Sequence, residues 1–140
     1  MPALTTAEVL GLSPKQVVSP IGLIEQIEGG LPFATLDRIT GFLAPGDTQF
    51  KYRFVPRATW SRRKAAHKLS LDEGTKLARV AKVYTAAVDA WGSKDEARNF
   101  LFRAHPMIND KLPIDVVMKS ELGADLVMDI LGRLKYGTAA

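Results

Sequence analysis

The chain has 140 residues, with 46% hydrophobic and 24% charged residues, which suits one compact domain or two small helical modules. It has no cysteine, which excludes disulfides, thiolate catalysis and cysteine zinc sites. No apolar stretch approaches the length of a membrane span, and the first residues do not resemble a secretory leader, so we expect a cytoplasmic protein.

The formal net charge of +4 is unevenly distributed along the chain. Residues 1–50 carry two basic and five acidic side chains, and residues 69–140 carry ten of each. Residues 51–68 carry seven Lys or Arg and no Asp or Glu. Such a local positive field attracts polyanions, so this segment indicates an anionic partner.

Two short helices are predicted in the first third of the chain. Ser-Pro pairs at 13–14 and 19–20 each place an N-cap residue before a proline that suits the first helical position. The second pair and Gly29 delimit a helix over 21–28. Apolar residues at helical spacing predict another over 33–43, which the turn at Pro45 ends.

The segment Gln49–Val55 gives a conflicting signal. Aromatic and basic residues alternate in it, which taken alone is typical of a half-buried strand. A lone strand would leave its backbone groups without a sheet partner, and the sequence offers no convincing second strand. We therefore expect a helix here.

Two capping boxes introduce the helices that follow. Ser70-x-x-Glu73 begins a long helix, and Ser93-x-x-Glu96 begins a shorter one that should close at His105-Pro106. The apolar stripe of the long helix, which ends at Gly92, is Leu77, Val80, Ala81, Tyr84, Ala87, Val88 and Trp91. The shorter helix should bury Ala97, Phe100, Leu101 and Ala104.

Two further helices complete an all-α prediction. Leu112-Pro113 begins a short helix through Met118, and a final helix ends at Gly137. The stripe of that final helix, which we expect to be buried, is Leu122, Leu126, Val127, Ile130, Leu131 and Leu134.

Catalytic and metal-binding motifs are not recognised. His67 and His105 are the only histidines, and neither has the neighbours of a triad or a metal motif, so we expect no catalytic residue, metal or cofactor. Glu121, Asp125 and Asp129 share one helix face, where a metal site or a partner-facing acidic strip is the alternative to a solvated face. The solvated face is the favoured interpretation.

The basic segment has a DNA-binding interpretation and an ordinary one. A helix that begins after Pro56 would present groups able to bind phosphates and base edges: Arg57, Thr59, Ser61, Arg62, Arg63, Lys64 and Lys68. The ordinary interpretation is a solvated basic face. Trp60 is more simply a packing anchor for this helix than a base-stacking residue, because the sequence shows no single-strand groove.

Three stretches carry a family resemblance: ATWSRRKAAHKLSLDEGTKLARVAKVY, WGSKDEARNFLF and KLPIDVVMKSELGADLVMDILGRLKYG. Their Thr-x-x-Arg-Arg-Lys run, Leu-Ser-x-x-Glu junction, Leu-Pro-x-Asp and closing Gly-x-x-x-Val occur in an order that resembles the Xre/MbcA/ParS antitoxins. The resemblance covers residues 56–137 well and 20–55 loosely. Lys76 stands where the family often has arginine.

The resemblance implies an Xre-like helix-turn-helix DNA-binding module over 1–68 and a helical toxin-binding domain over 69–140. It implies a RES-domain toxin that degrades NAD, inhibited through its active site, and operator DNA bound by a homodimer within a larger toxin-antitoxin complex. The residues carried over as toxin-binding are Arg133, Lys135, Tyr136 and Gly137. A stand-alone helix-turn-helix regulator without a toxin is the alternative.

Overall fold

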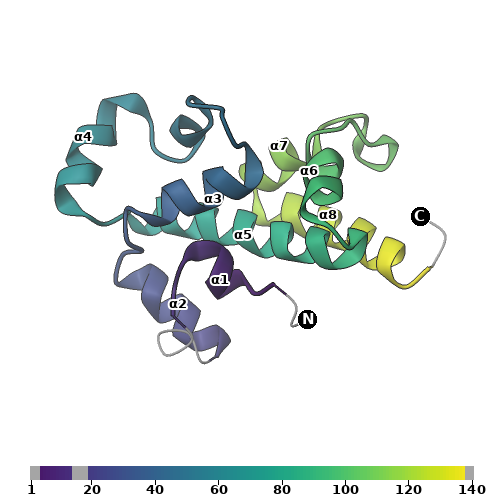
Figure 1. Cartoon of the computed structure of the whole chain (residues 1–140), viewed down its shortest axis with the longest axis horizontal. Coiled ribbons are helices and arrows are strands. Elements are labelled where there is room, and N and C mark those ends of the chain that lie inside the picture. Colours follow the sequence, from purple (N-terminus) through teal and green to yellow (C-terminus); the bar gives the residue numbers. More distant parts are fainter. Residues whose placement is uncertain (1–3, 14–18, 138–140) are drawn as a thin grey trace. The chain divides into compact units, whose positions relative to one another are not determined.

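The computed structural model describes residues 4–13 and 19–137, and every regular element in those ranges is helical, which confirms the all-α prediction (Figure 1). The elements are α1 (Thr6–Leu10), α2 (Pro20–Glu28), α3 (Thr35–Leu43), the 3-10 helix η1 (Phe50–Arg53), α4 (Arg57–Ala66), α5 (Leu71–Trp91), α6 (Lys94–Leu101), the 3-10 helix η2 (Pro106–Ile108), α7 (Pro113–Lys119) and α8 (Glu121–Lys135). The helix start predicted at Ser13-Pro14 lies outside the described residues. The chain divides into two compact units, Thr5–Ala78 and a C-terminal unit that begins at Arg79.

The N-terminal unit begins with a helix that sequence reasoning missed. In α1 the Thr5 hydroxyl accepts a hydrogen bond from the Glu8 amide at 3.1 Å, and Gly11 closes the helix with φ of 74°. The Arg38 guanidinium of α3 donates to the Glu8 carbonyl at 2.6 Å and so ties the two helices together. The Thr-x-x-Glu pattern at Thr5 was the signal that could have revealed α1.

The helices predicted over 21–28 and 33–43 are confirmed as α2 and α3. Ser19 caps α2 as expected, since its hydroxyl accepts from the Gly22 amide at 3.2 Å. The core of this unit is apolar and consists of Val9, Leu10, Leu12, Leu31, Leu36, Ile39, Leu43, Phe50, Phe54, Val55, Leu69, Leu77 and Ala78. Residues of α2 are absent from this core, because none of them is buried.

Within the segment Gln49–Val55, residues Phe50–Arg53 form the single 3-10 turn η1 and none forms a strand, so the strand alternative is wrong. The ring of Phe50 lies edge to face with that of Phe54, which follows the turn, with ring centroids 5.8 Å apart. Both rings and Val55 are buried. A 3-10 turn of four residues is too short for a helical period to show, so the alternation in sequence could not separate it from a strand.

In α5 and α6 the predicted stripes are mostly right. Ser93 caps α6 as predicted, with its hydroxyl accepting from the Glu96 amide at 3.1 Å. Two positions at the ends differ from the prediction: Trp91 is 38% exposed, and Ala104 is exposed because α6 ends at Leu101 rather than at His105.

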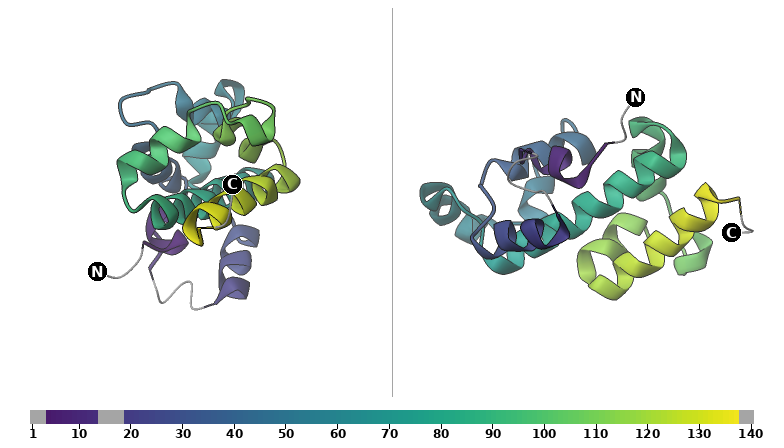
Figure 2. Two further views of the ribbon diagram at one scale, coloured as in Figure 1. Left: turned by 90° about the vertical axis from the view of Figure 1, so that its right-hand side faces the viewer. Right: turned by 90° about the horizontal axis from the view of Figure 1, so that it is seen from below.

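The pairing of α7 with α8 corrects the predicted stripe of the last helix (Figures 1 and 2). Leu122 and Leu126 are 71% and 49% exposed, whereas Gly123 and Ala124 are buried. A Cβ atom on Gly123 would lie 2.2 Å from the Val116 carbonyl oxygen. The two helices approach too closely for leucine at their contact, so small residues fill it and the leucines face outward.

Candidate functional site

The first candidate surface is the basic surface, defined by Arg57, Thr59, Ser61, Arg62, Arg63, Lys64 and Lys68, on and after α4. This helix follows Pro56 and ends at His67, which adopts the left-handed conformation with φ of 60°. None of its residues is buried. An amphipathic helix normally docks through an apolar stripe, so α4 needs another means of attachment to its unit.

An aromatic cluster supplies part of that attachment. The Trp60 ring packs edge to face against Phe33 and Tyr52, with centroids 4.9 and 5.2 Å away. The Lys51 ammonium lies 4.9 Å from the centroid of the Trp60 ring. Edge-to-face pairs and cation–π contacts each contribute about 0.5–1.5 kcal/mol. The structure thus supports the interpretation of Trp60 as a packing anchor.

An ion pair holds the other end of α4. The Arg63 guanidinium donates to the Glu73 carboxylate at 2.7 Å, and the same carboxylate oxygen accepts from the Ser70 amide at 2.8 Å. The predicted capping box is complete, because the Ser70 hydroxyl accepts from the Glu73 amide at 3.2 Å. Burial alone would raise the pKa of Glu73, but these hydrogen bonds outweigh it and hold the pKa below the usual value.

Lys76 holds the turn that precedes α4. Its ammonium donates to the Arg53 carbonyl at 2.9 Å, at the C-terminal end of η1. Carbonyls at the end of a helical turn have no intrahelical partner, so a cation from α5 satisfies this one. The lysine that stands where the family often has arginine therefore serves a structural contact with one carbonyl.

The residues of the basic surface divide by their contacts. Arg57 lies 4.1 Å from the Tyr52 ring centroid and also donates to Gln49, and the Thr59 hydroxyl donates to the Pro56 carbonyl at 3.1 Å. Arg63 is in the ion pair with Glu73. The exposed members of the surface outside these contacts are Ser61, Arg62, Lys64 and Lys68. Lys68 pairs through its backbone with Pro32, which places it beside the start of α3.

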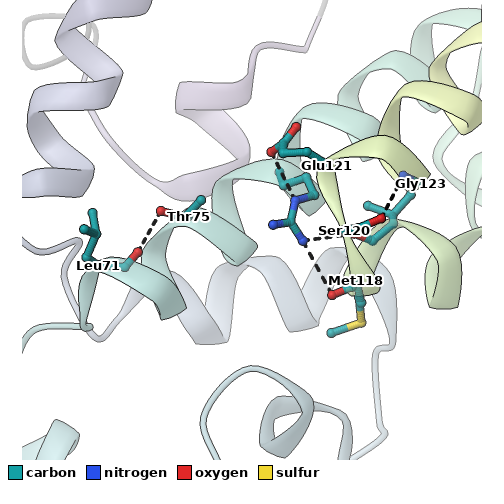
Figure 3. A network of polar contacts seen from close by, with 8 residues as sticks. Leu71, Thr75, Met118, Ser120, Glu121 and Gly123 are labelled. Carbon is teal, nitrogen blue, oxygen red and sulfur yellow. Dashed lines mark hydrogen bonds and ion pairs between the residues drawn. The ribbon is translucent and has the colours of Figure 1, made fainter.

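The C-terminal unit is organised around Arg79 of α5. Its guanidinium donates to the Val117 and Met118 carbonyls at 3.2 and 3.5 Å, and to the Glu121 carboxylate at 3.1 Å. Figure 3 shows Met118, Ser120 and Glu121 around this contact, where α7 ends and α8 begins. Ser120 caps α8, since its hydroxyl accepts from the Gly123 amide at 3.0 Å. Arg79 thus satisfies the last carbonyls of α7. Sequence reasoning missed this role.

The second candidate surface is the C-terminal tip, defined by Arg133, Lys135, Tyr136 and Gly137. Arg133 is exposed, and the Tyr136 ring is 75% exposed with the Lys135 ammonium 5.4 Å from its centroid. Lys135 also forms an ion pair with Asp89 of α5. The hydrogen bond to Asp89 raises the pKa of Lys135 above its usual value, so the lysine is charged at neutral pH. The tip therefore presents positive charge and an aromatic ring to solvent.

A pocket that the sequence did not predict lies next to this tip, and we call it the α6–α8 pocket. It has a volume of about 270 Å³ and is lined by Trp91, Glu96, Asn99, Phe100, Arg103, Ala104, His105, Ile130 and Leu134. All of these residues belong to the C-terminal unit. Its lining combines residues from three helices and the loop after α6. The predicted stripes supplied two separate pairs of these residues, Phe100 with Ala104 and Ile130 with Leu134, and periodicity within one helix could not show that the pairs meet.

The described residues give no support for a metal site or for a membrane-spanning helix. Within residues 4–13 and 19–137, acidic and histidine side chains do not gather in a group of three that could hold a metal ion. In the same part of the chain, helices of sufficient length and apolarity to cross a membrane are not found.

Comparison with known protein families gives two matches. Residues 22–82 match the model of the antitoxin Xre-like helix-turn-helix domain, and residues 86–137 match that of the antitoxin Xre/MbcA/ParS C-terminal toxin-binding domain. No curated protein matches the chain. The first match contains the whole basic surface, and the second contains the C-terminal tip and every lining residue of the α6–α8 pocket. The two matches together cover most of the chain, and the chain belongs to the Xre/MbcA/ParS family of antitoxins.

Proposed function

We propose that this antitoxin inhibits a RES-domain toxin that degrades NAD, and that it does so by placing the C-terminal tip in the toxin's active site. The observation that carries the proposal is the tip itself, which lies within the toxin-binding match and combines an exposed Tyr136 ring with the cations Arg133 and Lys135. A site that binds NAD must accommodate an anionic pyrophosphate and flat rings. Guanidinium and ammonium groups can occupy a site that binds pyrophosphate only if it offers groups that pair with them, and a phenol ring can occupy a site that binds flat rings.

The proposal predicts a neighbouring gene for a RES-domain protein, and co-expression of this chain with that protein tests it. The wild-type chain should restore growth and cellular NAD, and Arg133→Glu should lose most of this protection because it reverses the charge that faces the pyrophosphate site. Lys82→Glu, an exposed charge reversal on α5, is the matched control and should protect like wild type. If the wild-type chain fails to protect, the proposed inhibition is wrong; if Arg133→Glu protects fully, the assignment of the tip is wrong.

We also propose that the helix-turn-helix domain represses the operon of this chain, with α4 as the recognition helix and η1 in the place of the scaffold helix. Support comes from α4, which exposes Ser61, Arg62 and Lys64 and buries none of its residues in its own unit. Two copies related by a two-fold axis would read the two halves of a palindromic operator. Phosphate contacts by these cations would make the affinity strongly dependent on salt.

Mobility shifts with the DNA upstream of the gene test this second part. Arg62→Ala should weaken binding and reduce the slope of log affinity against log salt by about 1 if Arg62 contacts a phosphate. Lys119→Ala, an exposed substitution at the end of α7, should leave both quantities unchanged. Absence of any shift at low salt would refute operator binding. A shift without protection from the toxin would instead favour the stand-alone regulator.

A further inference from the structure

We propose that the α6–α8 pocket binds one large apolar side chain, aromatic or long aliphatic, that projects from the toxin. This inference rests on the proposed function, since it names a second point at which the toxin is held besides the C-terminal tip. It concerns recognition outside the toxin's active site.

The walls of the pocket are mostly apolar, and its polar groups come from Glu96, Asn99, Arg103 and His105. The ring centroids of Trp91 and Phe100 are 6.1 Å apart. The His105 ring lies edge to face with Phe100, with ring centroids 6.0 Å apart. Ile130 and Leu134 of α8 add aliphatic surface. The His105 Nδ1 atom accepts from the Met107 amide at 3.1 Å, which fixes the orientation of this ring. The pocket is thus a preformed and mostly apolar socket with polar groups in its lining.

The size of the pocket suits one bulky side chain. Its volume of about 270 Å³ lies close to the lower end of the range of about 300–1,000 Å³ that is usual for ligand sites. Binding energy at protein interfaces is concentrated in a few bulky side chains that fill desolvated pockets of this kind. Trp91, 38% exposed, leaves part of an indole ring in contact with water until such a side chain covers it.

The pocket adjoins two other features of α8, which are the exposed leucines Leu122 and Leu126 and the C-terminal tip. Leu122 and Leu126, both largely exposed, lead by steps of four residues to Ile130 and Leu134, which line the pocket. Residues four apart on a helix are neighbours, so the two exposed leucines lead along α8 to the wall of the pocket, where Ile130 is itself buried. Leu134 lies between Arg133 and Lys135 of the C-terminal tip. A protein that engages the tip would therefore meet these leucines and the pocket on the same helix, and the toxin is the partner that the matched domain binds.

Filling the pocket tests the proposal. Asn99→Trp and Ala104→Trp each introduce an indole at an exposed position of the lining, so neither disturbs the buried core. Lys94→Trp adds the same side chain to α6 at an exposed position outside the lining and is the control. Helicity and thermal melting should match wild type in all three, and the use of two filling variants keeps the test valid if one misfolds.

Affinity for the RES-domain toxin is measured by titration calorimetry with a catalytically inactive toxin. Both filling variants should bind at least about 30-fold more weakly than wild type, the loss typical of an interface hot spot, and Lys94→Trp should stay within about threefold. If folded filling variants bind as tightly as wild type, the pocket inference is wrong, although the proposed inhibition stands.

A direct probe separates this inference from the proposed function. N-acetyl-phenylalaninamide at millimolar concentration should shift the NMR signal of the Trp91 indole N–H in wild type and in Lys94→Trp, but not in Ala104→Trp. If the toxin does not bind wild type at all, the proposed function fails and this measurement alone decides the pocket: a shift supports an apolar side-chain socket, and no shift overturns it.

Discussion

The contact between α7 and α8 gives a sharp prediction, because one glycine on α8 is sterically required and another is not. A Cβ atom at Gly123 would lie 2.2 Å from the Val116 carbonyl oxygen, whereas ordinary contact begins at 3.4 Å, so the helices would have to separate by more than an ångström. A Cβ atom at Gly132 would meet no atom within 4 Å. Both glycines lie within the same helix, so alanine gains the same helical propensity at each, about 1 kcal/mol.

The difference between Gly123→Ala and Gly132→Ala therefore isolates the steric cost, since the propensity cancels. Overpacking of this kind costs about 1–3 kcal/mol, or more where backbone must move. We expect Gly132→Ala to be about 0.5–1 kcal/mol more stable than wild type and Gly123→Ala to be about 1–3 kcal/mol less stable than Gly132→Ala. Urea unfolding followed by circular dichroism measures both. Equal stabilities for the two variants would refute the close helix contact.

Three further predictions concern the contacts around α4 and α5. Arg79→Met should lower the stability of the C-terminal unit by about 2–3 kcal/mol in urea melts, because charge-assisted hydrogen bonds to two carbonyls of α7 are lost. Arg79→Lys should recover only part of this lost stability. An unchanged urea midpoint in Arg79→Met would argue against the capping role of Arg79. Glu73→Gln should cost about 1 kcal/mol at pH 7 through the weakened cap. The pKa of Glu73 is lower in the folded state, so its contribution to stability is complete above the usual pKa of 4.5 and is lost as the pH falls through the folded pKa. The urea midpoints of wild type and Glu73→Gln should therefore converge in acid. A constant difference between the two midpoints at all pH values would contradict this. Trp60→Ala should speed amide hydrogen exchange in α4 far more than in α5, because the aromatic cluster is lost; equal acceleration would show that Trp60 does not anchor α4 specifically.

Local signals in the sequence were sufficient to locate most of the fold. The capping boxes at Ser70 and Ser93 and the Ser-Pro start of α2 each predicted a hydrogen bond that the structure contains. These signals work because a cap is completed within four residues and needs no distant partner. The same logic would have found α1 through Thr5, which uses the same chemistry.

What the sequence could not predict depends on distances between helices. Large apolar residues were expected to form the buried stripe of α8, but the close approach at Gly123 buries small residues and leaves Leu122 and Leu126 exposed. The α6–α8 pocket and the carbonyl contacts of Arg79 likewise join residues tens of positions apart. Arg63 was grouped with the DNA-binding residues by its charge alone, and only the structure places it against Glu73.

The absence of buried residues from α4 has a consequence for how this antitoxin can evolve. Apart from the anchors Trp60 and Arg63, most positions of α4 add little to the packing of the N-terminal unit. Substitutions elsewhere on this helix carry little penalty for folding. If α4 reads the operator and the C-terminal tip binds the toxin, as proposed, the operator preference could change by substitution in α4 without any change in the surface that recognises the toxin.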